Sequence, residues 1–212
     1  MANLLTILRM ILAVLAIELI FSGRPDFIIS SIVLTLLVIA LDGLDGIVAR
    51  HYNEQSKFGS VFDILGDRVV ENLYWIAFAV IGWVGVWVPM VVVTRGILTD
   101  GLRSIALSQG YTAFGESTMM KNKFFHFLTA SRFSRAVYGI AKTIVFVFVI
   151  IAYFPNLEFY DGMSIETFGK FAMYQEHFIT FANILVYITV GMCVIRGIPV
   201  IIESKNYINA DK

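Results

Sequence analysis

Four aspartates lie close together in the stretch that begins at Leu41 and reads LDGLDGIVARHYNEQSKFGSVFDILGDR. Asp42 and Asp45 are three residues apart, and Asp63 and Asp67 are four apart, so each pair shares one face if its segment is helical. A short turn between two such helices makes them antiparallel neighbours, and the four carboxylates then converge. Hard divalent cations prefer oxygen ligands. The spacing therefore predicts a site for two ions such as Mg²⁺, Mn²⁺ or Ca²⁺.

Small residues and one arginine accompany these aspartates. Gly46, Ala49 and Gly59 have little or no side chain, which permits close helix packing or the close approach of a ligand. Arg50 supplies a planar donor suited to phosphate. Paired metal ions stabilise charge on the entering and leaving oxygens of a transferred phosphoryl group. The combination predicts phosphoryl transfer.

The rest of the chain is unusually apolar. Hydrophobic residues make up 58% of the 212 residues, where a soluble domain has about 45–50%. A membrane-spanning helix needs about 20 mostly apolar residues. Six stretches qualify, namely 4–22, 27–49, 58–82, 86–108, 137–155 and 178–202. We therefore expect an all-α integral membrane protein, a six-helix bundle that forms one domain over 1–212. The first stretch lacks a basic leader and a cleavage site, which predicts a retained helix.

The basic residues predict the orientation. If the N-terminus is cytoplasmic, 14 of the 16 Lys and Arg residues fall on the cytoplasmic side, and only Arg24 and Lys170 fall outside. The positive-inside rule favours this topology, with both termini in the cytoplasm. The four aspartates then lie near the cytoplasmic boundary, a few residues inside the membrane. Carboxylates at that depth are costly unless something compensates for their charge, so we expect a functional site there.

The stretch DGLDGIVARHYNEQSKFGSVFDILGD resembles the signature of the CDP-alcohol phosphotransferase family, D-x-x-D-G-x-x-A-R, eight residues, then G-x-x-x-D-x-x-x-D. Every fixed place is filled, by Asp42, Asp45, Gly46, Ala49, Arg50, Gly59, Asp63 and Asp67. The resemblance implies a six-helix membrane bundle, a homodimer, and a transferase of phospholipid synthesis whose donor is CDP-diacylglycerol or an archaeal ether analogue. It also implies a bacterial or archaeal cell membrane.

The resemblance assigns a role to each aspartate. Asp42, Asp45 and Asp63 would hold two metal ions, Mg²⁺ or Mn²⁺, and Asp67 would ligate one ion and act as the general base toward the acceptor hydroxyl. The N-terminal NLLTILR resembles the family's first-helix motif, although Ala2 replaces the usual proline. The residues that the resemblance places at the CDP-lipid are Asn3, Thr6, Arg9, Gly46, Ala49, Arg50, Ser56 and Gly59.

The acceptor is less closely specified. RGILTDGLRSIA, from Arg95, resembles an R-E-x-x-x-S-G-L-R segment of phosphatidylglycerophosphate synthases, but Gly96 and Asp100 replace its Glu and Ser. A small phosphorylated alcohol would be bound through its phosphate by cationic side chains of the protein. The candidates for an acceptor-phosphate site are Arg95, Arg103, Arg132, Arg135 and Lys142. Glycerol 3-phosphate is the expected acceptor, and inositol phosphate, inositol and serine stay open as alternatives.

Other functions fit less well. A divalent-cation transporter also needs intramembrane carboxylates, but Arg50 beside them would oppose the passage of ions. A membrane prenyltransferase needs two aspartate motifs far apart in the chain. Nucleic-acid binding is not expected, because the net charge is zero. MMKNKFFHFLTASRFSR, from Met119, predicts an amphipathic segment on the membrane surface. Glu71 is expected to pair with an arginine, and Glu18 and His51 receive no role.

Overall fold

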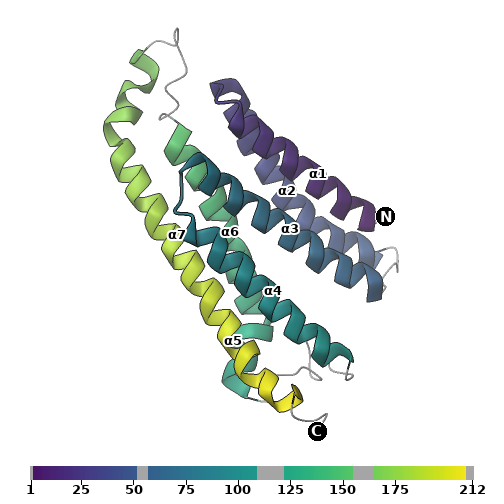
Figure 1. Ribbon diagram of the computed structural model, residues 1–212. Helices are drawn as coiled ribbons and strands as arrows, with labels where there is room; N and C mark the ends of the chain where they lie inside the picture. The colour runs from purple at the N-terminus through teal and green to yellow at the C-terminus, as the bar shows by residue number, and fades with distance from the viewer. Residues whose placement is uncertain (1, 52–56, 109–121, 155–164, 209–212) are drawn as a thin grey trace. The chain divides into compact units, whose positions relative to one another are not determined.

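The computed structural model describes residues 2–51, 57–108, 122–154 and 165–208, and every element in these ranges is helical (Figure 1). The elements are α1 (Ala2–Phe21), α2 (Pro25–His51), α3 (Lys57–Ile81), α4 (Trp87–Ser108), α5 (Lys123–Ala130), α6 (Arg132–Tyr153) and α7 (Ile165–Ile208). The six predicted apolar stretches coincide with α1, α2, α3, α4, α6 and α7. The prediction of an all-helical integral membrane protein is confirmed, whereas the exact number of spans and the side of the termini stay predictions.

Glycine and proline fix the helix boundaries. Gly23 has a φ of 69° after α1, and Pro25 is the first residue of α2, where its missing N–H costs no hydrogen bond. At the end of α3, Gly82 has a φ of 86°, and the Trp83 amide donates to the Phe78 carbonyl at 2.8 Å. This contact satisfies a carbonyl that the last turn of a helix otherwise leaves open. The turns α1–α2 and α3–α4 are thereby short and defined.

Among the described residues, four segments are long and apolar enough to cross a bilayer: Asn3–Phe21, Asp26–Gly43, Lys123–Tyr153, which contains α5 and α6, and Tyr174–Lys205. Helices α3 and α4, with 25 and 22 residues, are as long, but each carries several charged side chains. Large apolar side chains such as Val33, Val80 and Ile97 are 61–69% exposed. Outward-facing apolar residues are expected where the surrounding solvent is lipid.

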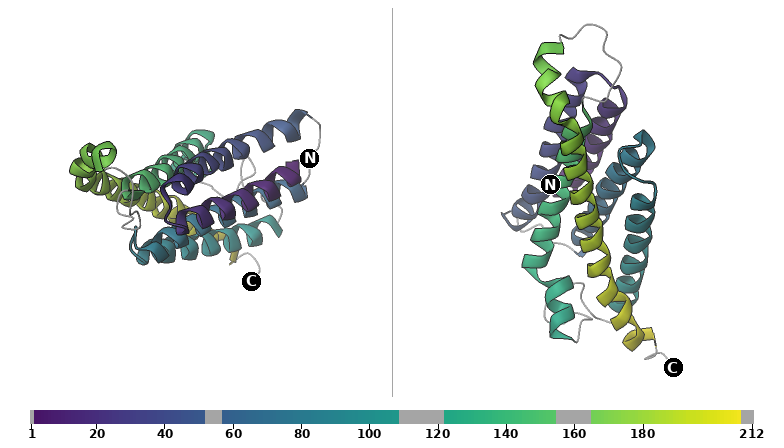
Figure 2. Two further views of the ribbon diagram at one scale, coloured as in Figure 1. Left: turned by 90° about the horizontal axis from the view of Figure 1, so that it is seen from above. Right: turned by 90° about the vertical axis from the view of Figure 1, so that its left-hand side faces the viewer.

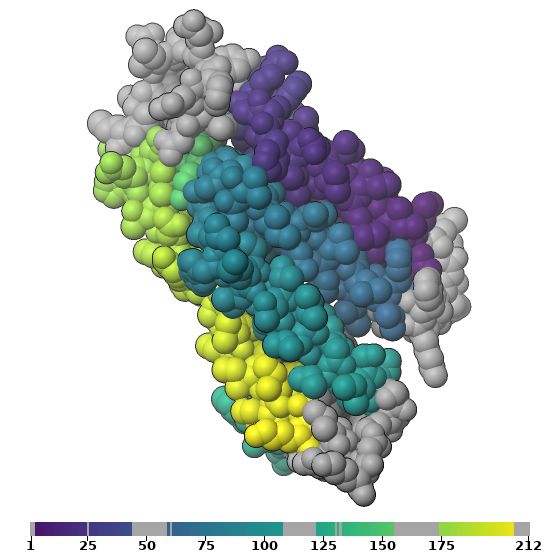
Figure 3. All heavy atoms as spheres, viewed as in Figure 1, coloured from purple at the N-terminus to yellow at the C-terminus, as the bar shows by residue number. Residues whose placement is uncertain are grey.

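The chain divides into two compact units. The first contains Met1–Val86 and Thr143–Ile184, and the second contains Trp87–Lys142 and Leu185–Lys212. Helices α6 and α7 therefore contribute to both units. In the first unit, α1 lies against α2 and α3 (Figure 3). An aromatic core joins α3 to α6, where Tyr74 stacks on Phe146 with 4.9 Å between ring centroids and shares a 2.7 Å hydrogen bond with Thr35.

The second unit is held together by contacts of α7 with α4, α5 and α6. Trp87 stacks on Tyr187 at 5.7 Å between ring centroids. Ala106 and Val200 are buried together, and Phe125 of α5 packs against them. Figure 2 shows that the chain changes direction between α5 and α6.

Two helix starts differ from the sequence prediction. The apolar pattern predicts helices from 137 and 178, but α6 begins at Arg132 and α7 begins at Ile165. A run of apolar residues marks only the portion of a helix that suits lipid. Polar and basic turns that extend the same helix do not belong to that run. Part of the predicted outer loop at 156–177 is therefore the first part of α7.

Candidate functional site

Three aspartates from two helices meet in the first unit. Asp42 lies on α2, and Asp63 and Asp67 lie one turn apart on α3. Each offers one carboxylate oxygen, and these oxygens lie within 4.8 Å of one another. The three side chains are between 43% and 48% exposed, so solvent or a ligand can reach them. The structure thus brings Asp63 and Asp67, which share a face by their spacing, together with Asp42 of α2.

Arg9 of α1 enters the same cluster from a third helix. Its side chain is only 2% exposed. Its guanidinium is 2.9 Å from the carboxylate of Asp67 and 3.3 Å from that of Asp63, and it also pairs with Asp42. One buried cation therefore compensates part of the charge of three carboxylates. The resemblance predicts Arg9 at the nucleotide lipid, and the structure places it among the aspartates.

The close approach of α1 to α3 depends on a glycine between the two aspartates of α3. A Cβ atom at Gly66 would lie 2.4 Å from Cγ2 of Thr6 and 3.1 Å from a guanidinium nitrogen of Arg9. Thr6 is 2% exposed and packs at this position. Only a residue without a side chain lets α1 come this near. Gly66 is thus the packing feature that positions Arg9, and the family signature does not include it.

Several predicted site residues fall outside the side chains that the structure describes. The backbone of Asp45, Gly46, Ala49 and Arg50 continues α2, but the positions of their side chains are not described. Ser56 and the side chain of His51 also lie outside the described part of the chain. Gly59 lies in the first turn of α3 and is half-buried, and Asn3 is half-buried on α1. Their roles therefore rest on the sequence pattern.

The three described carboxylates fit a metal ion. Oxygen ligands at mutual distances below 4.8 Å form a hard donor set of the kind that Mg²⁺ and Mn²⁺ prefer. Arg9 contacts these same carboxylates. A cation at this place and the guanidinium therefore compete for one set of ligands. The cluster can bind a divalent metal ion, in competition with Arg9.

The predicted acceptor-phosphate residues lie in the second unit. Arg95 and Arg103 are two turns apart on α4, and both are half-buried. A Cβ at Gly197 would lie 2.9 Å from Cγ of Arg95, so the stem of this arginine passes closely over α7. The buried Nε of Arg95 has no hydrogen-bond partner within the described residues. It is therefore held in place by packing while part of its donor capacity is unused.

The other predicted cations already have protein contacts. Arg103 pairs with Asp100 at 3.3 Å, on the position where the resembling segment has serine. Lys142 lies over the ring of Tyr138, with 5.2 Å from Nζ to the centroid. Arg135 also has interactions within the protein, and the side chain of Arg132 is not among those described. Among the candidates whose side chains are described, Arg95 keeps a buried Nε donor that an anionic ligand could use.

Two charged residues of α7 were not predicted. Arg196 is 7% exposed, lies over the Tyr138 ring at 5.3 Å, and donates to the Thr129 carbonyl at 3.4 Å. Glu203 is 6% exposed and accepts from the amide of Asn122 at 3.2 Å. The position of Arg196 within an apolar stretch could have identified it from the sequence. The expected pairing of Glu71 with an arginine is confirmed, because Arg68 lies 3.2 Å from its carboxylate.

Comparison with known proteins shows which family this chain resembles. Residues 1–195 match the CDP-alcohol phosphatidyltransferase family. A probable phosphatidylglycerophosphate synthase of Mycobacterium tuberculosis (strain ATCC 25618 / H37Rv) is 25% identical over 113 residues, which cover 52% of this chain and 54% of that protein. The CDP-diacylglycerol–glycerol-3-phosphate 3-phosphatidyltransferase of Mycoplasma pneumoniae is 36% identical over 74 residues, which cover 35% of this chain and 33% of that protein.

One further relative carries a different acceptor in its name. The CDP-diacylglycerol–inositol 3-phosphatidyltransferase 1 of Arabidopsis thaliana is 37% identical over 67 residues, or 32% of this chain and 28% of that protein. The chain thus spans about half of the mycobacterial protein's length and a third or less of the other two. The names agree on the donor, CDP-diacylglycerol, where they give one, and they differ on the acceptor.

Proposed function

This chain belongs to the CDP-alcohol phosphatidyltransferase family, and from that premise we propose that it transfers a phosphatidyl group from CDP-diacylglycerol to glycerol 3-phosphate and releases CMP. The observation that carries the proposal is the cluster of Asp42, Asp63 and Asp67 inside a membrane protein of this family. Carboxylates inside a membrane protein are energetically costly, and those that occur there usually mark a functional site. The names of the mycobacterial and mycoplasmal relatives support the acceptor.

The reaction needs three contributions from the chain. Asp42, Asp45, Asp63 and Asp67 would hold two ions, Mg²⁺ or Mn²⁺, which when bound stabilise the negative charge of the diphosphate and of the leaving CMP. Arg50 would bind a phosphate of the donor. The small residues Gly46, Ala49 and Gly59 would let the cytidine diphosphate approach the helices, with Asn3, Thr6 and Ser56 beside it.

Asp67 is the proposed general base. The hydroxyl oxygen of the acceptor attacks the phosphorus that carries diacylglycerol, and the bond from this phosphorus to the oxygen of CMP breaks. The hydroxyl proton passes to a carboxylate oxygen of Asp67. Arg9 lies 2.9 Å from that carboxylate and holds it in the cluster. The products are the new phosphodiester lipid, CMP and one proton.

We infer that Arg95 and Arg103 of α4 bind the acceptor phosphate. Arg95 has a buried Nε without a hydrogen-bond partner in the described structure, and Arg103 is two turns away on the same helix. Guanidinium groups bind phosphate through parallel hydrogen bonds. Arg132, Arg135 and Lys142 are weaker candidates for this anion, since two of them have contacts within the protein.

A second acceptor class is supported by one specific observation. The Arabidopsis relative is named for transfer to inositol. The same donor chemistry with inositol, inositol phosphate or serine requires no change in the aspartate cluster. A site that recognises only hydroxyl groups would not require the unused donor of Arg95, and this favours a phosphorylated acceptor.

The expected setting follows from the family and the apolar helices. We propose that the protein spans the membrane several times, with both termini and the aspartate cluster at the cytoplasmic face, and that it acts as a homodimer. The distribution of Lys and Arg supports this orientation.

One experiment tests both donor and acceptor. The purified protein is supplied with CDP-diacylglycerol and Mg²⁺ or Mn²⁺, and with one candidate acceptor at a time. CMP release and the mass of the lipid product are then measured. We expect CMP only when acceptor is present, and the product of glycerol 3-phosphate at the highest kcat/KM. CMP release without acceptor would show hydrolysis of CDP-diacylglycerol. A higher kcat/KM for inositol or serine than for glycerol 3-phosphate would show that the proposed acceptor is wrong.

A further inference from the structure

Helix α5 is a short helix with defined ends beside α7. The side chain of Asn122 caps its first turn by accepting from the amide of Phe124 at 2.9 Å. The helix ends at Ser131, which has an extended backbone with ψ of 144°. The Oγ of Ser131 accepts from the amide of Ser134 at 3.1 Å, so the same residue that ends α5 caps α6. The break between the two helices is therefore built by specific hydrogen bonds.

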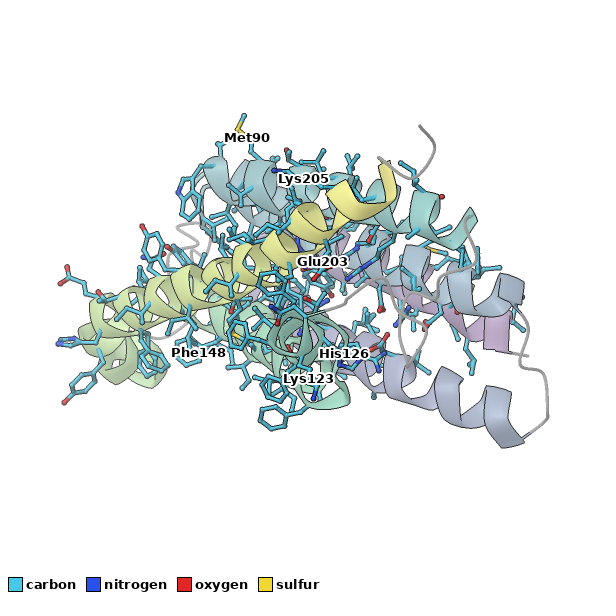
Figure 4. All side chains as sticks on the ribbon, turned by 90° about the horizontal axis from the view of Figure 1, so that it is seen from below. Met90, Lys123, His126, Phe148, Glu203 and Lys205 are labelled. Carbon is cyan, nitrogen blue, oxygen red and sulfur yellow. The ribbon has the colours of Figure 1, made fainter. Side chains whose placement is uncertain are left out.

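One side of α5 is fastened to α7. Glu203 accepts from the amide of Asn122 at the start of α5, and Arg196 donates to the carbonyl of Thr129 near its end. Phe125 packs between these two contacts against Ala106 and Val200. Figure 4 labels Lys123 and His126 on α5 and Glu203 on α7. The two polar contacts and the apolar one fix the rotation of α5 about its own axis.

This rotation leaves an aromatic surface on the other side. Phe124 is 65% exposed and Phe127 is 54% exposed, and Phe133 at the start of α6 is 68% exposed. Phe127 and Phe133 stack on each other, with 6.4 Å between ring centroids and 20° between ring planes. We call Phe124, Phe127 and Phe133 the phenylalanine face. Lys123 is exposed next to it.

The charge around this face has one sign. No Asp or Glu occurs in the sequence between Glu116 and Glu158. The basic residues in that interval are Lys121, Lys123, Arg132, Arg135 and Lys142. Glu203 contacts the start of α5, but it is buried and accepts a hydrogen bond from the Asn122 amide. An apolar helix face with basic neighbours is complementary to the boundary between phospholipid acyl chains and anionic headgroups.

We propose that α5 lies in the headgroup region of a bilayer that contains anionic phospholipid, with the phenylalanine face inserted toward the acyl chains and Lys123 at the lipid phosphates. On α6, Ile140 and Ile144 follow Phe133 by seven and eleven residues, and they are 59% and 49% exposed. With α6 as a predicted membrane span, α5 marks the depth at which the chain leaves the acyl region. This inference does not depend on the group that the protein transfers.

A second copy of the chain is a poorer fit to the phenylalanine face. Three phenylalanine side chains of about 200 Å² each, exposed by about two thirds, offer roughly 400 Å². A stable protein interface buries about 800 Å² per partner. Lipid requires no minimum area of this kind, because each inserted ring gains from leaving water on its own.

The depth of the face can be measured with a fluorescent label. Cys193 is the one cysteine of the chain and is 1% exposed, so Cys193→Ala gives a background in which Phe127→Cys carries a single environment-sensitive probe. Ile144→Cys is the matched control, since its residue is also half exposed and lies about 17 Å along α6 from Phe133. Both labelled proteins are reconstituted in vesicles with lipids that carry a spin label at a shallow or a deep acyl position.

We expect the shallow label to quench the probe at 127 at least twice as strongly as the deep label, and the reverse order at 144. Quenching of the probe at 127 by iodide in the water phase, without quenching by either lipid, would overturn the proposal. So would a disulfide between two chains in the unlabelled Phe127→Cys variant, because the face would then be covered by a second copy.

The headgroup preference has its own measurement. Spin-labelled phosphatidylglycerol and spin-labelled phosphatidylcholine are compared at equal fractions, with the probe at 127. We expect about twofold stronger quenching by the anionic lipid, and loss of this difference in Lys123→Gln. Equal quenching by both lipids in the unsubstituted background contradicts the charge part of the proposal.

Discussion

The guanidinium of Arg9 lies 2.9 Å from the carboxylate of Asp67, and these two residues come from the first and third helices of the chain. The same guanidinium contacts Asp63 and Asp42, and its side chain is 2% exposed. The carboxylates are therefore held in one cluster by a protein cation as well as by helix spacing. Metal affinity and catalysis can therefore be tested separately, by substituting Arg9 for the first and Asp67 for the second.

Substitution of a predicted metal ligand should abolish turnover without unfolding the protein. Asp42→Asn and Asp63→Asn each remove one negative oxygen from the cluster. Since even the outer partners of metal ligands contribute about 10–100-fold, we expect a loss of at least roughly a hundredfold in CMP release. Asp26→Asn is the matched control, because Asp26 is an exposed carboxylate in the first turn of α2. Near-normal turnover of both cluster variants would exclude the assignment.

Substitution of the proposed base should separate chemistry from donor binding. In Asp67→Asn, the remaining aspartates can still hold an ion and the diphosphate, but the hydroxyl proton loses its acceptor. General-base catalysis typically supplies about 10²–10⁴-fold, so kcat should fall by at least about a hundredfold. The affinity for CDP-diacylglycerol, titrated with Mg²⁺ or Mn²⁺ present, should change far less. If affinity and kcat fall together, Asp67 is a metal ligand alone.

Removal of the arginine from the cluster should increase metal affinity. Arg9 contacts all three described carboxylates, so a divalent ion must compete with it. In Arg9→Gln we expect tighter Mn²⁺ binding by calorimetry without lipid substrate, and an intermediate affinity in Arg9→Lys, which keeps the charge but not the planar donor. Arg24→Gln, an exposed arginine whose guanidinium lies over Phe27, serves as the control. Unchanged or weaker Mn²⁺ binding in Arg9→Gln would show that the guanidinium does not compete.

A methyl group at position 66 should disturb the same cluster through packing. The Cβ of Gly66→Ala would meet Cγ2 of Thr6 at 2.4 Å. Overpacking of this kind costs about 1–3 kcal/mol, and we expect a lower thermal midpoint together with reduced turnover. Thr6→Ser removes Cγ2, so the double variant should recover part of both.

The control for this change is Gly101→Ala on α4, where an added Cβ meets nothing within 4 Å. Its thermal midpoint should be unchanged or higher, because alanine favours helix over glycine. Equal effects of the two alanine substitutions would show that the α1–α3 contact is looser than its geometry indicates.

Substitution in α4 should affect the acceptor more than the donor. Arg103→Ala removes a cation that now pairs with Asp100 and would bind the acceptor phosphate. We expect the KM for glycerol 3-phosphate to rise about tenfold or more, in line with a charged hydrogen bond of about 1.5–3 kcal/mol. The KM for CDP-diacylglycerol should stay within about twofold. If the KM values for glycerol 3-phosphate and for CDP-diacylglycerol rise equally, Arg103 stabilises the fold and does not bind the acceptor.

The helices and the aspartate cluster are local features and could be predicted from the sequence. Runs of apolar residues indicated the positions of α1–α4, and spacing of four placed Asp63 and Asp67 on one face. The pairing of Glu71 with Arg68 is also local, since the two residues are three apart. Such features depend on helix periodicity, which one sequence displays directly.

Contacts between distant helices could not be predicted in this way. Arg9 and Asp63 are 54 residues apart, and their ion pair depends on the approach that Gly66 allows. Arg196 and Thr129 are 67 apart, and their contact depends on the break at Ser131. An arginine in an apolar stretch indicates that a partner exists, but the identity of the partner is set by tertiary packing. The amphipathic character of α5 was predictable, whereas its fastening to α7 was not.

The separation of 54 residues between Arg9 and Asp63 also orders the biogenesis of the protein. During translation, α1 is synthesised before α3, so Arg9 is part of the chain before Asp63 and Asp67 are available to pair with it. A lone arginine at a helix centre costs about 2.5–3.5 kcal/mol on insertion scales and less near the interface. We therefore expect the nascent α1 to keep its guanidinium in the hydrated boundary until the carboxylates are present. On this expectation, the burial of Arg9 follows the insertion of the third helix.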